Sequence, residues 1–201
     1  MIKENDVRLN HTNMSKDFDK QKEKPQLKKC LTAKELCYFK MIHTYFKFKC
    51  PKLEITRMLD IIEKKSCISL RVLDWFITRY SKRGIDIKNH QDENFDVHIN
   101  YKAQLKSFKK KYFDPFRRRQ RFDYLFDLVD HTRVLNTTLG QLNFFRWAIE
   151  NKIIDYVQAN LNTIIKAMNA SNKEDKKKKQ KKKKLLILNY IKNLSDEELK
   201  N

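Results

Sequence analysis

Lysines and arginines gathered in one stretch of the chain are the residues best suited to bind a partner. Residues 102–122 contain nine of them against the single acid Asp114, which gives the stretch a local charge of +8. Aromatic residues lie between these cations, and such a combination can neutralise phosphates and stack on bases. The plainer alternative is a solvated helix face with its rings in the core, although no nearby acids balance the charge. We expect nucleic-acid contacts from Lys106, Lys109, Lys110, Lys111, Arg117, Arg118, Arg119 and Arg121.

A second basic stretch lies near the end of the sequence. Eight of the nine residues 176–184 are lysines, and residues 173–184 together carry a charge of +7. A lysine block is typical of a nuclear-import signal, a nonspecific nucleic-acid arm or a contact with an acidic membrane surface, and a solubilising linker is the alternative. The contacts expected here are Lys176, Lys177, Lys178, Lys179, Lys181, Lys182, Lys183 and Lys184.

Two groups of residues have side chains that could bind a metal. Cys30, Cys37, His43 and Cys50 are nominal zinc ligands, but spacings of six, five and six residues match no compact zinc knuckle, so buried thiols are expected instead. The second group is Asp123, Asp127, Asp130 and His131. On a helix, the side chains of Asp123, Asp127 and His131 would share one face, which a metal-dependent nuclease could use. Pairing of these acids with the neighbouring arginines is the simpler explanation. We therefore expect no metal site, no cofactor and no enzymatic activity.

The composition narrows both the fold and the class of partner. Only two glycines and three prolines occur in 201 residues, which favours helices and removes the glycine-rich loops that bind nucleotide phosphates. A net charge of +20 points to a polyanion, most commonly nucleic acid. The first 30 residues hold no apolar secretory segment, and no stretch approaches the roughly 20 apolar residues of a membrane span. The four cysteines are therefore expected to be free thiols in a reducing compartment.

The patterns along the chain predict a disordered N-terminal arm over residues 1–30, one α-rich globular domain over 31–170, and a lysine-rich tail with a short amphipathic segment over 171–201. Thr32 and Thr138 have capping-box spacing and should begin helices, the second of which carries Trp147 into the core. Alternation over 95–101 predicts a strand paired with 85–87, whereas 102–112 and 117–129 are predicted to be helical. The expected fold class is α-rich α+β, a helical domain with a short two-stranded element flanked by disordered basic tails.

Four segments also carry a family resemblance. They read SLRVLDWFITRYSK at 69–82, YKAQL at 101–105, FDPFRR at 113–118 and TTLGQLNFFRWA at 137–148. Together they resemble an uncharacterised protein family of large nucleocytoplasmic DNA viruses, over about residues 66–158. The resemblance implies a viral protein that acts in an infected cell or is packaged in the particle. It assigns no catalytic or binding residue.

These observations predict a non-enzymatic, sequence-nonspecific nucleic-acid-binding protein whose target is DNA or RNA. One alternative is a structural or interaction component of a virus particle without direct nucleic-acid contact, with other virion proteins as partners. A weaker alternative is a metal-dependent nuclease, and a small-molecule substrate is not expected. The expected location is inside the cell, in the host nucleus or a cytoplasmic viral factory, with packaging in the virion left open.

Overall fold

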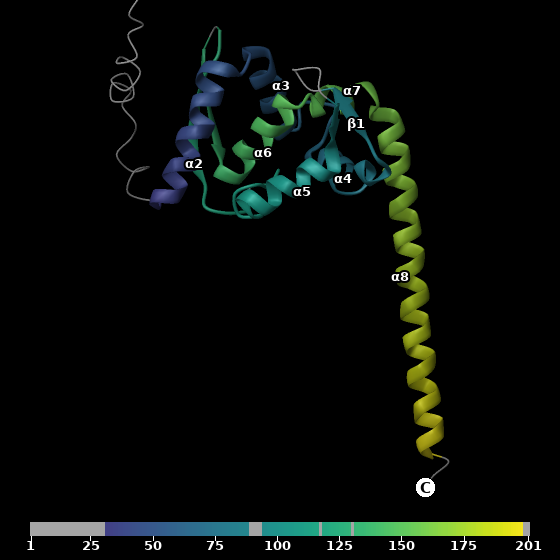
Figure 1. Cartoon of the computed structure of the whole chain (residues 1–201). Coiled ribbons are helices and arrows are strands. Elements are labelled where there is room, and N and C mark those ends of the chain that lie inside the picture. Colours follow the sequence, from purple (N-terminus) through teal and green to yellow (C-terminus); the bar gives the residue numbers. More distant parts are fainter. Residues whose placement is uncertain (1–30, 89–93, 117, 130, 199–201) are drawn as a thin grey trace, which may run out of the picture.

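The computed structural model of the chain describes residues 31–88, 94–116, 118–129 and 131–198, with side chains described as far as residue 189 (Figure 1). The predicted N-terminal arm, residues 1–30, lies outside the described residues. Within the described part of the chain, helices pack around one core and are joined by two small antiparallel sheets. The predicted α-rich α+β class is therefore confirmed.

The first helix begins where the sequence predicts, and further helical segments follow it. Thr32 caps α2 (Ala33–Thr44) in a complete capping box with Glu35. The chain continues directly into a π-helical turn, η2 (Tyr45–Lys49), and Pro51 precedes α3 (Lys52–Ile62). Ser69 caps α4 (Leu70–Thr78), and a 3₁₀ turn, η3 (Tyr80–Arg83), ends at Gly84, whose φ of 77° is the left-handed conformation that favours glycine.

The first sheet confirms a predicted pairing and corrects a predicted length. Strand β1 (Asp86–Lys88) pairs with β2 (Asn94–Asp96), and Ile87 lies opposite Phe95. The strand predicted over 95–101 ends at Asp96, where α5 (Val97–Phe108) begins. The reason is a helix cap: the Asp96 side chain accepts a hydrogen bond of 2.6 Å from the backbone N–H of Ile99, which stabilises the first helical turn.

The second sheet replaces a predicted helix. Residues 122–127 form β3 (Phe122–Asp127), paired with β4 (Thr132–Thr137) in an antiparallel hairpin, so the helix predicted over 117–129 was wrong. The side chains alternate with a period of two: Tyr124 and Phe126 are buried, whereas Asp123, Leu125 and Asp127 are exposed. Burial of one aromatic face outweighed the charge spacing that favoured a helix.

The most buried helix is α6 (Leu139–Glu150), which Thr138 caps as predicted. Its residues are buried on almost every side, and Trp147 is only 2% exposed. The Trp147 indole N–H donates a hydrogen bond of 2.8 Å to the side chain of Asn100. The ring also packs near Phe113 and Phe144, at centroid distances of 5.3 and 6.0 Å. The predicted core position of Trp147 is confirmed.

The chain ends in two more helices, α7 (Ile153–Ala159) and the long α8 (Leu161–Glu198). The start of α8 packs on the body through Ile164 and Met168, and the rest projects away from it (Figure 1). The lysine-rich tail predicted over residues 171–201 lies on this helix as far as residue 198. The segment contains no glycine or proline, and lysine is a good helix former. Among the described residues, no helix combines the length and apolar character needed to cross a membrane.

Candidate nucleic-acid interface

The basic residues predicted in 102–122 lie at the end of α5 and in the segment that leads into β3. Lys106 is in the last turns of α5, and Lys109–Lys111 form the turn after it. Arg118, Arg119 and Arg121 follow in an irregular, exposed segment, while Arg117 lies outside the described residues. Apart from Lys106 on α5, the described members of this cluster therefore lie in one segment between α5 and β3, which we call the basic loop (described residues 109–116 and 118–121).

Buried polar groups at the start of α6 hold the basic loop in place. The Gln141 side-chain amide donates to the carbonyl of Pro115 at 2.7 Å, and that of Asn143 donates to the carbonyl of Tyr112 at 2.9 Å. At Gly140, an added Cβ would lie 3.0 Å from the Lys111 carbonyl, a tight contact with backbone, so the close approach favours glycine. Charge-based reasoning missed these residues, although two resemblance segments, 113–118 and 137–148, contain most of them.

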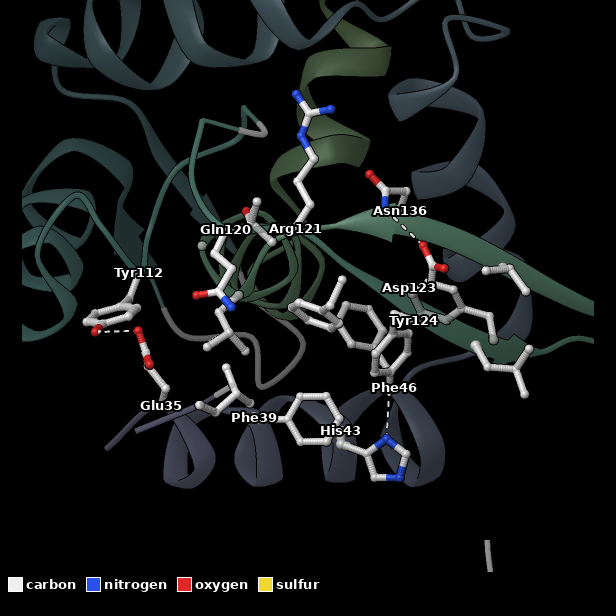
Figure 2. Close-up of a pocket in the computed structure, with 18 of the residues that line it drawn as sticks. Glu35, Phe39, His43, Phe46, Tyr112, Gln120, Arg121, Asp123, Tyr124 and Asn136 are labelled. Atoms are coloured by element: carbon white, nitrogen blue, oxygen red, sulfur yellow. Dashed lines mark hydrogen bonds between the residues drawn. The ribbon is translucent and has the colours of Figure 1, made fainter. Parts of the chain in front are cut away.

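One side of the basic loop borders a groove between α2–η2 and the β3–β4 hairpin. The groove has a volume of about 900 Å³. Its floor is aromatic: Phe39, Phe46 and Tyr124 pack edge to face, with ring centroids about 6 Å apart. His43 shares a hydrogen bond of 2.9 Å with the Tyr124 hydroxyl (Figure 2).

The groove lining carries more positive than negative charge. Five cationic side chains line it against three carboxylates, an excess of two positive charges. Figure 2 shows Gln120 extending toward α2, whereas Arg121 points away from that helix. The cationic members are Lys47, Lys52, Lys111, Arg119 and Arg121, and the acidic members are Glu35, Asp123 and Asp127.

Glu35 fixes one end of the groove. Its buried carboxylate accepts hydrogen bonds from the backbone N–H of Thr32 at 3.0 Å, from Lys111 at 2.9 Å and from the Tyr112 hydroxyl at 3.0 Å. The Thr32 bond, followed by the Lys111 bond, lowers the pKa of Glu35 to about 2. Glu35 is therefore ionised at neutral pH, and it orients Lys111 while compensating its charge.

Two further acids compensate part of the basic loop. Burial raises the pKa of Asp74, and the nearby Asp114 raises it further, whereas Arg118 and Lys110 act in the opposite direction. Arg118 also lies 3.5 Å from the Asp114 carboxylate. The effective charge of the basic loop is thus lower than the number of its cations suggests. Asp74 was not singled out by the sequence analysis, because it lies far from the cluster along the chain.

The lysines of the second basic stretch lie on α8. An ion pair of 2.6 Å between Arg79 and Asp175 joins α8 to the body immediately before Lys176. All eight lysines of residues 176–184 are exposed, and we call them the lysine arm. Figure 1 shows α8 at the side of the body away from α2, so the lysine arm and the groove are separate surfaces.

The predicted geometry of a metal-dependent nuclease does not occur in the described part of the chain. Asp123 and Asp127 lie on strand β3 instead of a helix, and Asp123 accepts a hydrogen bond of 2.9 Å from the Asn136 amide. No group of three or more potential metal ligands occurs among the described residues. Cys50 is buried, which raises the pKa of its thiol to about 11, whereas Cys37 is exposed and Cys30 lies outside the described residues.

Comparison with known proteins places the chain in a family. Residues 113–148, which hold the basic loop and the start of α6, fall within the 13–200 stretch that matches the model of DUF7197, a family of unknown function. The chain is also 42% identical over 127 residues to an uncharacterised protein, L507, of Acanthamoeba polyphaga mimivirus. That match covers 60% of this chain and about half, 49%, of the length of the mimivirus protein. No solved structure matches the chain. The chain therefore belongs to the DUF7197 family, which confirms the resemblance to an uncharacterised family of large nucleocytoplasmic DNA viruses.

Proposed function

We propose that this chain is a non-enzymatic, sequence-nonspecific nucleic-acid-binding protein. The observation that carries the proposal is the lysine arm, in which eight exposed cations follow one another along a projecting helix. Glu174 and Asp175 are the nearest acids before the arm, and Asp175 is already paired with Arg79. Asp175 also interacts with Lys178 and Lys179, but residues 176–189 contain no carboxylate of their own, so most of the charge of the arm is uncompensated.

The spacing of these charges suits a nucleic-acid backbone. Nine helical residues span about 13 Å, so eight charges lie about 1.7 Å apart along the axis, similar to the charge spacing of about 1.7 Å along duplex DNA. Nine residues also make about two and a half turns, so lysines occur on every face of the helix. Such a rod can release counterions from phosphates without reading bases, which favours nonspecific binding.

A salt series on two variants of the full chain tests the proposal. In the first, glutamine replaces the eight arm lysines, which removes the charge and keeps good helix formers. In the second, the chain ends after Ala170. Both should lose affinity for DNA and RNA of any sequence, with a shallower dependence of log Kd on log salt. Unchanged affinity and slope in both variants would contradict the proposal, and cleavage of the nucleic acid with magnesium would favour a nuclease instead.

One observation favours the alternative function, a structural or interaction component of a virus particle. Four consecutive apolar residues directly after the lysine arm, residues 185–188, are each at least 50% exposed on α8. An exposed apolar run on the projecting part of a helix suits a contact with another virion protein. In either case we propose that the protein acts inside the infected cell, in the nucleus or a cytoplasmic viral factory, or is packaged in the virion. Localisation of the tagged chain, with and without the arm, tests the import role.

A further inference from the structure

We propose that the groove between α2–η2 and the β3–β4 hairpin binds single-stranded nucleic acid, with Phe48 as the stacking platform for an unpaired base. The inference rests on the proposed function and deepens it by naming a second site and the form of nucleic acid that it takes. The lysine arm would then bind phosphates of any nucleic acid, and the groove would bind unpaired bases.

The first observation is the position of Phe48 in the π-helical turn. Tyr45 and Phe46, in the same turn, are 7% and 2% exposed and pack into the core, but the Phe48 side chain is 62% exposed and lines the groove. An exposed phenylalanine ring offers a flat face that any base can stack on. The Lys47 ammonium lies 5.2 Å from the centre of this ring, so a cation is positioned beside the stacking face.

A second pair of the same kind lies at the other end of the groove. The Lys111 ammonium is 4.8 Å from the centre of the half-buried Tyr112 ring, and both residues bond to Glu35 in the first turn of α2. Glu35 and Phe48 are 13 residues apart on the continuous α2–η2 helix, which corresponds to roughly 20 Å along its axis. The groove thus has a cation and an aromatic ring at each end, with an aromatic floor between them.

The charge of the groove favours a flexible anionic strand. The excess of positive charge in its lining favours phosphate, and exposed Arg119 is one of the lining cations. A duplex keeps its bases stacked inside and cannot present a base face to Phe48, whereas a single strand can. The floor rings already pack on one another, and Tyr112 packs on Tyr38, so the exposed Phe48 ring is the aromatic group placed to receive a base.

Substitutions at Phe48 test this inference in the full-length chain. Phe48→Ala removes the ring, Phe48→Trp keeps a stacking face, and Phe48→Leu keeps only apolar bulk. Leu53→Ala is the matched control, since Leu53 is 70% exposed on α3 and does not line the groove. Binding is measured by fluorescence anisotropy with an oligothymidylate of roughly 12 nucleotides and with a duplex of the same length. Ultraviolet cross-linking of the oligothymidylate, followed by mass spectrometry, identifies the residues that touch it.

Phe48→Ala should weaken single-strand binding by about five- to tenfold and leave duplex binding and the helical circular dichroism unchanged. Phe48→Trp should bind like the wild type, and the cross-link should fall within residues 45–49. The inference is overturned if Phe48→Ala changes nothing or weakens the binding of single strand and duplex equally. It is also overturned if Phe48→Leu binds the single strand as strongly as the wild type, because apolar bulk without a ring would then be sufficient, as at a site for an apolar peptide. If the wild-type chain binds neither duplex nor single strand, the proposed function itself is refuted. If it binds duplex without a preference for single strand, only the single-strand site in the groove is refuted.

Discussion

The ion pair between Arg79 and Asp175, at 2.6 Å, marks the last described contact between α8 and the body of the protein. Before it, Ile164 and Met168 are buried against the core. After it, every described side chain of α8 from residue 176 onward is exposed. The helix beyond Asp175 is therefore held by its own backbone hydrogen bonds and local interactions, without tertiary packing from the described part of the chain.

This division predicts that helix content beyond Asp175 depends on ionic strength. The lysine pairs 177–181, 178–182 and 179–183 are each one helical turn apart, and like charges at that spacing cost about 0.2–0.5 kcal/mol per pair. Added salt or a polyanion should screen this repulsion and raise the circular dichroism signal at 222 nm, in the full chain but not in one that ends after Ala170. If the signal of the full chain is independent of salt, repulsion between the lysines does not limit the helix content of the arm and the prediction is wrong.

The basic loop should bind phosphates of its own. Replacing Arg117, Arg118 and Arg119 by alanine should lower the slope of log Kd against log salt by roughly two to three units, because each phosphate that is no longer neutralised on duplex DNA accounts for about 0.9. Arg118 is expected to contribute least, because it is already 3.5 Å from the Asp114 carboxylate. Arg71→Ala, an exposed substitution on α4, serves as control. A collapse of the helical signal in the triple variant would show instead that the arginines are structural.

Glu35 predicts a defined response of stability to acid. Its pKa of about 2 in the folded protein lies below the ordinary value of 4.5, so its contribution is complete above pH 4.5 and is lost as the pH falls toward 2. Glu35→Gln should therefore lower the free energy of unfolding at pH 7 by about 1–2 kcal/mol, a value reduced from the full pKa shift for partial solvent screening.

The measurement is denaturant unfolding of wild type and Glu35→Gln at several pH values. The difference between them should shrink between pH 4.5 and pH 2, while a Glu174→Gln control on exposed α8 should show little difference throughout. A difference that is independent of pH would mean that the Glu35 carboxylate charge has no part in holding Thr32 and Lys111.

Local sequence signals were sufficient where one short segment decides the structure. The caps at Thr32 and Thr138 each depend on a residue three positions later, and the facing of Ile87 and Phe95 follows from two short apolar segments close in the chain. The buried position of Trp147 follows from the strongest apolar pattern in the sequence. Each of these features can be derived within one helix or hairpin.

Features that depend on distant residues were beyond such reasoning. The strand at Phe122 was mistaken for a helix because Arg119 and Asp123 have helical ion-pair spacing, and only packing against α2–η2 decides for the hairpin. The groove needs residues from α2, the basic loop and both hairpin strands, which no local period connects. Phe48 could have been identified as exposed only by knowing that the helix widens into a π turn at Tyr45.

The stability of the domain should depend strongly on Trp147, whereas its binding of nucleic acid should not. The ring is 2% exposed, packs against Phe113, Phe144 and Tyr101, and donates its N–H to Asn100. Trp147→Ala should lower the free energy of unfolding by about 3–5 kcal/mol through poorer packing and a residual cavity. That decrease is a large part of the roughly 5–15 kcal/mol available to a domain of this size, so thermal unfolding should shift strongly downward.

Trp147→Phe separates packing from hydrogen bonding. It keeps most of the apolar volume but leaves the Asn100 side chain without its donor, so we expect a decrease of about 1–3 kcal/mol, smaller than that of the alanine variant. Both effects are read from denaturant unfolding followed by circular dichroism, with oligonucleotide affinity measured where the variants remain folded. A variant that keeps wild-type stability and loses affinity would place Trp147 in a binding surface and contradict its role as a core residue.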